Sequence, residues 1–327
     1  MNATAAPPTR LPRYKRTQRE VACILTGRDL EILALVESFR LASSEHVQAL
    51  VEGSGQNILR RLQKLFHRGY LDRIRQELVE DGGSAKMVYA ITNKGIRELQ
   101  KAGKLDERTA TDWNAQNRGL HDLSIRHTLL ISHIHAVFAA LCQTHPDVRL
   151  SWRDEGRDIS DAIEVSLPEG YTRIPVAPDA FFRLENLKGR AHFFLEADRG
   201  TMTIQRFMMK LKAFAAYWRE RRHVERFGIR YFRVLTVTTS KIRAANLVAA
   251  AEADESIRAL GRLFLFTTED ALRLDRPQTA FENIWTMPGS KETHAILASP
   301  SSKNSALKED IPIGQKQDFP TRVSRAS

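Results

Sequence analysis

The sequence predicts a mixed α/β (α+β) protein built from two domains, and three observations support this. The chain has 327 residues, which is enough for two domains of ordinary size. Residues 27 to 92 show a helix, helix, helix, strand, strand order of apolar patterns. After the polar stretch 103–118, a long helical stripe gives way to alternating patterns typical of strands.

The charge of the chain indicates the kind of partner that it binds, and its cysteines indicate the redox state of its surroundings. Lys and Arg total 50 against 39 for Asp and Glu, so the formal net charge is +11. This surplus predicts an anionic partner, with nucleic acid as the first choice and an anionic membrane surface as the second. Cys23 and Cys142 are far apart and have no metal-ligand or CxxC spacing around them. We expect both to be reduced core residues of a cytoplasmic protein.

The two ends of the chain lack sustained apolar periodicity. Residues 1–20 contain several arginines and a lysine, and no apolar segment of the kind found in a secretory signal follows them. They are therefore predicted to be a disordered basic arm. Residues 288–327 are rich in Ser, Pro and Lys, which predicts a flexible tail. No stretch has the roughly 18 to 20 uncharged apolar residues of a membrane span, so no membrane span is expected, and DNA rather than a membrane is the predicted partner.

The third predicted helix of the amino-terminal half carries the first candidate binding surface. It buries an apolar stripe, and at about 100° per residue its opposite face is polar, basic and rich in amides. The stripe consists of Ile58, Leu62, Leu65 and Phe66. The opposite face consists of Gln56, Asn57, Arg60, Gln63, Lys64 and His67, with Arg61 on the flank.

Two strand patterns, 70–75 and 87–91, follow this helix and surround a turn near Gly82-Gly83, which predicts a hairpin. Three helices and a hairpin resemble the winged helix-turn-helix fold, whose third helix enters the major groove of DNA. We therefore predict a DNA-binding domain over residues 21–102, joined to the rest by a linker over 103–118. The candidate DNA-binding residues are Gln56, Asn57, Arg60, Arg61, Lys64 and Arg73. A protein-binding module with a merely solvated basic face is the alternative.

The second half, residues 119–287, is predicted to be an α/β domain. A long helix over 120–141 precedes strand patterns at 148–152, 176–184 and 192–198, and then a helix over 203–222 leads into a strand at 231–238. Glu196 and Asp198 lie two apart on one strand and so share a face. If the strand containing Asp179 pairs with theirs, three carboxylates converge, and such a cluster favours Mg²⁺ or Mn²⁺.

The span PDAFFRL…HFFLEADRGT resembles the PD-(D/E)XK motif of restriction-endonuclease-like nucleases. The resemblance implies that Asp179, Glu196 and Asp198 hold Mg²⁺ as catalytic residues. The motif lysine is replaced by Asp198 here, so Lys210 on the following helix is the catalytic candidate and Lys212 the reserve. A purely structural network, with Arg199 neutralising the acids, is the alternative.

The chain as a whole resembles the replication-relaxation family of plasmid and mobile-element proteins over about residues 25 to 240. The resemblance is carried by the amino-terminal domain and by LHDLSIRHTLL, PDAFF, FFLEADRGT and MKLKAFAAYW in this order. It implies a role in plasmid replication, DNA relaxation or mobilisation, with double-stranded DNA and replication or mobilisation proteins as partners. Two hypotheses follow for the second domain: a Mg²⁺-dependent nickase or endonuclease, or a catalytically inactive DNA-clamping part of a transcription or replication regulator.

Overall fold

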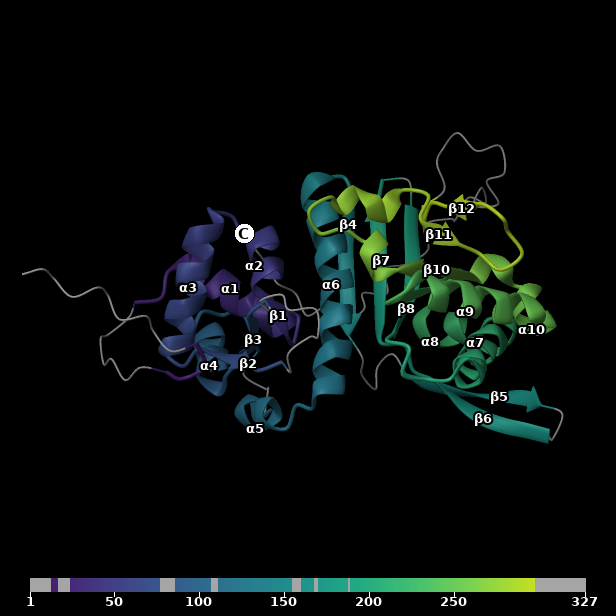
Figure 1. The fold of residues 1–327 in the computed structure, drawn as a ribbon, viewed down its shortest axis with the longest axis horizontal. Helices are drawn as coiled ribbons and strands as arrows, with labels where there is room; N and C mark the ends of the chain where they lie inside the picture. The colour runs from purple at the N-terminus through teal and green to yellow at the C-terminus, as the bar shows by residue number, and fades with distance from the viewer. Residues whose placement is uncertain are drawn as a thin grey trace, which may run out of the picture. The chain divides into compact units, whose positions relative to one another are not determined.

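The computed structural model describes residues 13–16, 24–76, 86–106, 111–154, 160–167, 170–187 and 189–297. Helices and strands are mixed along the chain, which confirms the predicted α/β class (Figure 1). The chain divides into two compact units between Ser132 and His133, within helix α6 (Asp122–Thr144). The predicted domain limits at 20, 102, 118 and 287 stay predictions.

The amino-terminal unit contains the expected three helices followed by two strands, with additional short elements. Its helices before α6 are α1 (Gly27–Ser38), α2 (Ser44–Leu50), α3 (Gly55–His67), α4 (Asn93–Lys101) and α5 (Trp113–Arg118). Its strands are β1 (Ala42–Ser43), β2 (Leu71–Ile74) and β3 (Val88–Ile91). They form an antiparallel sheet in the order β1-β3-β2. The predicted turn near Gly82-Gly83 lies outside the described residues.

Helix α3 begins where the side chain of Ser54 accepts a hydrogen bond from the backbone N–H of Asn57. Its four predicted apolar positions are buried, which confirms the predicted stripe. Helix α4 approaches the start of β2 so closely that only glycine fits at position 95. A Cβ at Gly95 would lie 2.5 Å from the carbonyl oxygen of Tyr70 and 2.9 Å from Cγ1 of Ile91.

The carboxy-terminal unit is built around a seven-stranded sheet in the order β12-β11-β10-β9-β8-β7-β4. Strands β8, β9 and β10 are parallel, and the other described pairs in this sheet are antiparallel. The strands are β4 (Arg149–Asp154), β7 (Ala180–Asn186), β8 (Gly189–Asp198), β9 (Arg233–Thr238), β10 (Phe264–Thr268), β11 (Trp285–Thr286) and β12 (Thr293–His294). The α-helices after α6 are α7 (Ile204–Arg219), α8 (Arg222–Phe227), α9 (Lys241–Ala253) and α10 (Glu255–Arg258). Short 3₁₀ turns cover 261–263, 269–271 and 277–281.

Alternating phenylalanines show how the two faces of this sheet are covered. Phe182 of β7 packs on Phe138 of α6, with ring centroids 4.9 Å apart. Phe194 of β8 packs on Phe214 of α7 at 5.7 Å. Because successive strand residues point to opposite faces, α6 covers one face and α7 the other, and Figure 1 shows α7 to α10 grouped together.

Several boundaries differ from the sequence predictions. The strand expected over 176–184 is two strands, because β6 (Gly170–Val176) ends before Pro178 and β7 begins after it. Proline has no N–H to donate to a sheet, so the strand is interrupted there. Strand β6 pairs instead with β5 (Asp161–Leu167) in a separate two-stranded ribbon that sequence analysis missed.

Other parts of the prediction also need correction. The helix expected over 203–222 ends at Arg219, and Arg221 adopts a left-handed conformation with φ of 56° before α8. Helix α5 lies inside the stretch predicted to be a linker, and β12 lies inside the stretch predicted to be a tail. Cys142, expected in the core, is half-buried.

Among the described helices, α6 is long and apolar enough to cross a membrane by length and composition alone. Sequence analysis missed this candidate span because it required an unbroken run of apolar residues. The helix also contains serine, threonine and histidine, which interrupt the apolar run but carry no formal charge. Half of the qualifying window is buried within the protein. Ile134, Val137, Phe138 and Leu141 are each fully buried, as in the core helix of a folded domain.

We predict that Gly95→Ala destabilises the protein by about 1–3 kcal/mol, because the added methyl group overlaps backbone that cannot move freely. Gly27→Ala is the matched control, since a Cβ there meets nothing within 4 Å. Thermal unfolding of both variants checks this. Equal midpoints for the two variants would contradict the close approach of α4 to β2.

Candidate nucleic-acid interface and acidic site

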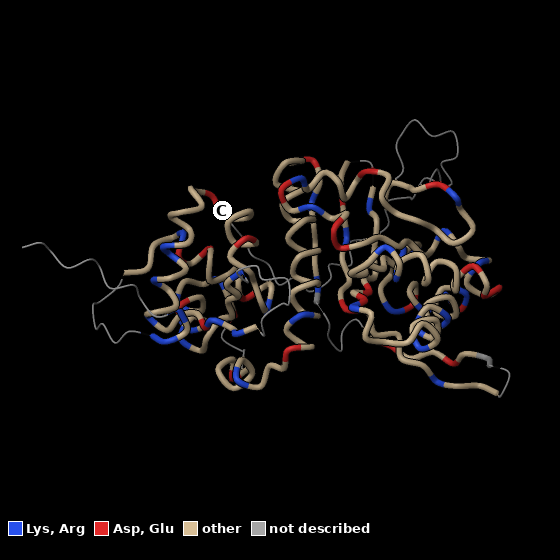
Figure 2. The backbone as a smooth tube through the Cα atoms, viewed as in Figure 1, with Lys and Arg blue, Asp and Glu red and all other residues tan. Residues whose placement is uncertain are grey.

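The exposed face of α3 presents four of the predicted DNA-binding side chains. Gln56, Asn57, Arg60 and Lys64 are all exposed. Arg60 donates a hydrogen bond to the side chain of Asn57 at 3.3 Å. Helix α3 contains no acidic residue, and Figure 2 shows basic positions recurring in this part of the chain. The face therefore combines cationic and amide groups without an acid on the same helix.

Arg61, also predicted to bind DNA, is part of the N-terminal cap of α1, and its role in DNA binding stays a prediction. Its Nη1 donates to Oγ1 of Thr26 at 2.8 Å and to Oδ1 of Asp29 at 2.9 Å. Asp29 is 1% exposed and completes a capping box with Thr26. Sequence analysis missed this contact because Asp29 and Arg61 belong to different helices.

The hydrogen bonds around Asp29 decide its ionisation. Burial by itself raises the pKa of this carboxyl, but the hydrogen bonds from Thr26 and Arg61 outweigh burial and hold the pKa below its ordinary value of 3.8. A carboxyl with a lowered folded-state pKa stabilises the fold above its unfolded-state pKa, and this stabilisation is lost as the pH falls through the folded-state pKa.

We predict that Arg61→Ala lowers the free energy of unfolding by about 1–3 kcal/mol at pH 7, since a buried carboxylate loses a charged donor. The difference from the wild type should shrink as the pH falls from the ordinary carboxyl pKa of 3.8 through the lower folded-state pKa of Asp29, because the carboxyl is then protonated. Denaturant unfolding at several pH values measures this. An unchanged stability at pH 7 would contradict a stabilising role of Arg61 in this cap.

Arg73 of β2, another predicted DNA contact, is turned toward aromatic rings. Its guanidinium carbon lies 4.3 Å from the ring centroid of Phe66 and 5.5 Å from that of Tyr89. Its Nη1 donates to the carbonyl oxygen of Arg13 at 2.7 Å. Arg73 is therefore a half-buried contact between the hairpin and residue 13.

In the carboxy-terminal unit, two of the three predicted carboxylates, Glu196 and Asp198, share one face of the sheet. Phe194, Glu196 and Asp198 alternate along β8, and Phe194 contacts α7, so both acids point to the α7 side. Asp179 lies in the turn before β7 rather than inside a strand. Its Oδ2 accepts a hydrogen bond from the backbone N–H of Ala197 at 2.7 Å.

The predicted lysine reaches this face. Lys210 precedes Phe214 by four residues, one helical turn, so the two side chains lie on the same side of α7. Phe214 packs on Phe194. One turn of α7 before Phe214, the ammonium of Lys210 forms an ion pair and hydrogen bond with Oε2 of Glu196. Lys212, the reserve candidate, pairs instead with Asp254 at 2.8 Å.

Glu196 is held in an unusual environment for a carboxylate. It is 1% exposed, and its Oε1 has no hydrogen-bond partner among the described residues. Burial raises the pKa of Glu196 well above its ordinary value. Lys210 opposes this shift, whereas the nearby charges of Asp179 and Asp198 add to it. The three acids are therefore close enough to influence one another electrostatically.

Asp198 is occupied by an arginine that sequence analysis missed. Nε of Arg243 donates to Oδ2 of Asp198 at 2.8 Å and Nη2 to Oδ1 at 3.2 Å. Thr238 on the neighbouring strand adds a hydrogen bond to Oδ2 at 3.0 Å. Arg243 stands in the first turn of α9, 45 residues along the chain from Asp198. Arg199, the predicted neutralising residue, is not the partner in these contacts.

These contacts change the predicted metal site. Within the described ranges, no group of three or more His, Cys, Asp or Glu side chains is arranged to hold a metal ion. Asp198 is already neutralised by Arg243, which leaves Asp179 and Glu196 as the carboxylates of the site. The position of Asp198 could be predicted from the strand alternation, but its partner could not.

A family model described as replication-relaxation matches residues 33–231, more than half of the chain. The chain therefore belongs to the replication-relaxation family, and the resemblance found in its sequence motifs is confirmed. Membership connects the protein to plasmid or mobile-element replication or DNA relaxation. No curated protein and no solved structure matches the chain.

Proposed function

We propose that this protein binds double-stranded DNA in the cytoplasm and acts in plasmid or mobile-element replication, relaxation or mobilisation. Its amino-terminal unit works as a winged helix, with α3 as the recognition helix. The exposed face of α3 is the observation that carries this proposal. It presents Gln56, Asn57, Arg60 and Lys64 to solvent opposite a fully buried apolar stripe.

The chemistry of these side chains fits the major groove. Asparagine and glutamine form paired hydrogen bonds with adenine, and arginine does so with guanine, whereas lysine and arginine also bind phosphates. The hydrogen bond from Arg60 to Asn57 orients both groups on one side of the helix. Plasmid replication or mobilisation proteins remain the expected protein partners.

We predict that Arg60→Ala combined with Lys64→Ala weakens binding to duplex DNA tenfold or more at moderate salt while the unfolding midpoint stays unchanged. Both side chains are exposed, so their loss leaves no buried group unpaired. Fluorescence anisotropy with a labelled duplex measures the affinity. The matched control is Arg97→Ala with Arg118→Ala, which removes the same charge from exposed positions on α4 and α5. If DNA binding weakens equally in both variants, the loss of net charge explains the effect and the α3 face has no special role.

The acidic site supports a second candidate function, a metal-dependent DNA nickase or endonuclease. The observation that favours it is the convergence of Asp179, Glu196 and Lys210, which supplies a carboxylate pair and a displaced lysine. The unpartnered Oε1 of Glu196 is an oxygen that a divalent cation could use. Mg²⁺ in proteins commonly takes one or two carboxylates and completes its shell with water and phosphate oxygens, so these residues fit the ion.

In this candidate function, Asp179 and Glu196 would hold Mg²⁺. The ion would polarise the scissile phosphate and lower the pKa of a water molecule. Lys210 would place its ammonium beside the phosphate oxygens and stabilise the negative charge that develops there. Hydrolysis joins the water oxygen to phosphorus and breaks one P–O bond, and the proton of water passes to the leaving oxygen. Arg243 keeps Asp198 out of the ligand set.

We predict that Mn²⁺ or Mg²⁺ supports nicking of supercoiled plasmid by the wild type and that Glu196→Gln and Lys210→Ala each reduce the nicking rate by tenfold or more. Lys212→Ala is the matched control, because this lysine pairs with Asp254 and not with Glu196. Gel analysis of plasmid forms measures the rate. If the wild type binds plasmid but leaves it intact with either ion, the non-catalytic DNA-clamping function replaces the nuclease.

A further inference from the structure

Two neighbouring aromatic rings reach the surface where helix α7 ends. The ring of Trp218 stacks on the imidazole of His223, with centroids 4.9 Å apart and planes inclined by 2°. Phe232 contacts the same indole edge to face at 5.3 Å. Trp218 is still only half-buried, and Tyr231, whose ring centroid lies 5.9 Å from that of Trp218, is 50% exposed. The carboxy-terminal unit therefore presents a pair of rings that are fixed from below by buried ones.

The buried ring of His223 is the point at which three segments meet. It stacks on Trp218 at the end of α7, and its Nε2 lies 3.2 Å from the carbonyl oxygen of Arg230, just before β9. Burial lowers the pKa of His223 below its ordinary value, and the positive charge of Arg221 acts in the same direction, so this guanidinium lies close to the ring. Arg221, Arg230 and the two rings are therefore gathered around one imidazole.

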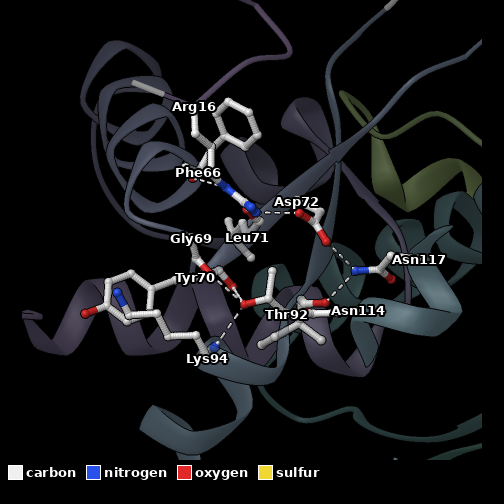
Figure 3. Close-up of polar contacts among 12 residues, drawn as sticks. Arg16, Phe66, Gly69, Tyr70, Leu71, Asp72, Thr92, Lys94, Asn114 and Asn117 are labelled. Carbon is white, nitrogen blue, oxygen red and sulfur yellow. Dashed lines mark hydrogen bonds and ion pairs between the residues drawn. The ribbon is translucent and has the colours of Figure 1, made fainter. Parts of the chain in front are cut away.

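Arginines of this protein differ in how many of their donors are used. Arg16 is fully engaged, although it lies in the arm that the sequence predicts to be disordered (Figure 3). Its Nε donates to the carbonyl oxygen of Phe66 at 3.1 Å and its Nη2 to that of Leu71 at 3.0 Å, and the same Nη2 pairs with Asp72. An arginine held in this way is part of the fold and offers little to a ligand.

Arg221 and Arg230 are the opposite case. Both are exposed, and within the part of the chain that the structure describes neither guanidinium forms a hydrogen bond or an ion pair. Residues 219–231 contain five arginines against two glutamates, and one of these acids, Glu225, pairs with Arg222. The surface beside the two rings is therefore positively charged and carries planar donor groups that are not used within the fold.

We propose that Trp218, Tyr231, Arg221 and Arg230, here called the aromatic patch, bind single-stranded DNA. Bases of a single strand can stack on exposed aromatic rings while cations beside the rings bind the phosphates. A duplex keeps its bases paired and stacked on one another, so an exposed ring of this kind favours a single strand. The patch belongs to the carboxy-terminal unit, so the inference goes beyond the proposed duplex binding by α3 and does not depend on it.

The members of the aromatic patch have different roles. Tyr231 is the more exposed ring, so it supplies the platform on which a base stacks. Trp218 is held by its buried neighbours and restrains the tyrosine ring through their contact. A ring that is already restrained loses less conformational entropy when a base stacks on it. Arg221 and Arg230 supply guanidinium groups, which are common partners of phosphate oxygens.

The test measures binding of a fluorescent oligothymidylate to the full-length protein by anisotropy. Tyr231→Ala/Arg221→Ala should weaken this binding about tenfold or more, since the loss of one stacking ring alone weakens it about fivefold or more. The slope of log K against log salt should also fall by about 0.7 for the lost phosphate contact. Tyr231→Phe in place of Tyr231→Ala should restore most of the lost binding, because it keeps the ring.

The matched control is Tyr171→Ala/Arg173→Ala. It removes the same residue types from exposed positions on β6 of the same unit, where Tyr171 is 79% exposed. The control should bind oligothymidylate as the wild type does, and unfolding midpoints show that each variant folds. Oligothymidylate binding that is unchanged in Tyr231→Ala/Arg221→Ala, or that falls equally in the control, would overturn the aromatic patch.

Other outcomes test the kind of nucleic acid. An equal loss of duplex binding in Tyr231→Ala/Arg221→Ala would overturn the preference for single strands, and tighter binding of oligouridylate than of oligothymidylate would assign the patch to RNA instead. Absence of oligothymidylate binding by the wild type would also overturn the inference. Duplex binding by α3 is measured separately with Arg60→Ala/Lys64→Ala, so either proposal can fail while the other stands.

Discussion

Strand β8 places alternate side chains on opposite faces of the central sheet, and the arrangement of the carboxy-terminal unit depends on this alternation. Phe193 faces the α6 side, where Phe182 packs against it, and Phe194 faces α7. Glu196 and Asp198 continue the row of Phe194. Burial of the phenylalanines therefore forces both carboxylates under the helices, where they require cationic partners.

Each carboxylate is neutralised by a different helix. Lys210 of α7 pairs with Glu196, and Arg243 of α9 pairs with Asp198. The two pairings have different chemical consequences. Arg243 saturates both oxygens of Asp198, which makes that pair structural, whereas Lys210 leaves one buried oxygen of Glu196 without a hydrogen bond. Any metal chemistry in this unit therefore depends on Glu196 and Asp179 rather than on the full acidic motif.

Basic side chains in the amino-terminal unit divide in a similar way between structural and exposed roles. Arg61 caps α1 through Asp29, Arg16 binds Asp72, and Arg73 packs between aromatic rings. Their charges are used within the fold. Arg60 and Lys64 remain exposed on α3, so the number of basic residues in the sequence exceeds the number of basic side chains that a polyanion can reach.

The sequence by itself determined the α/β class, the family, the apolar stripe of α3 and the shared face of Glu196 and Asp198, because these follow from local periodicity and short motifs. Lys210 was a candidate through the resemblance to nucleases with a displaced lysine, with Lys212 as the reserve, and the tertiary structure decided that Lys210 is the one that reaches Glu196. Only the tertiary structure decided the partners of Arg61, Arg73 and Asp198. Such pairings join elements far apart in the chain, and helical or strand periodicity carries no information about which distant charge will lie opposite.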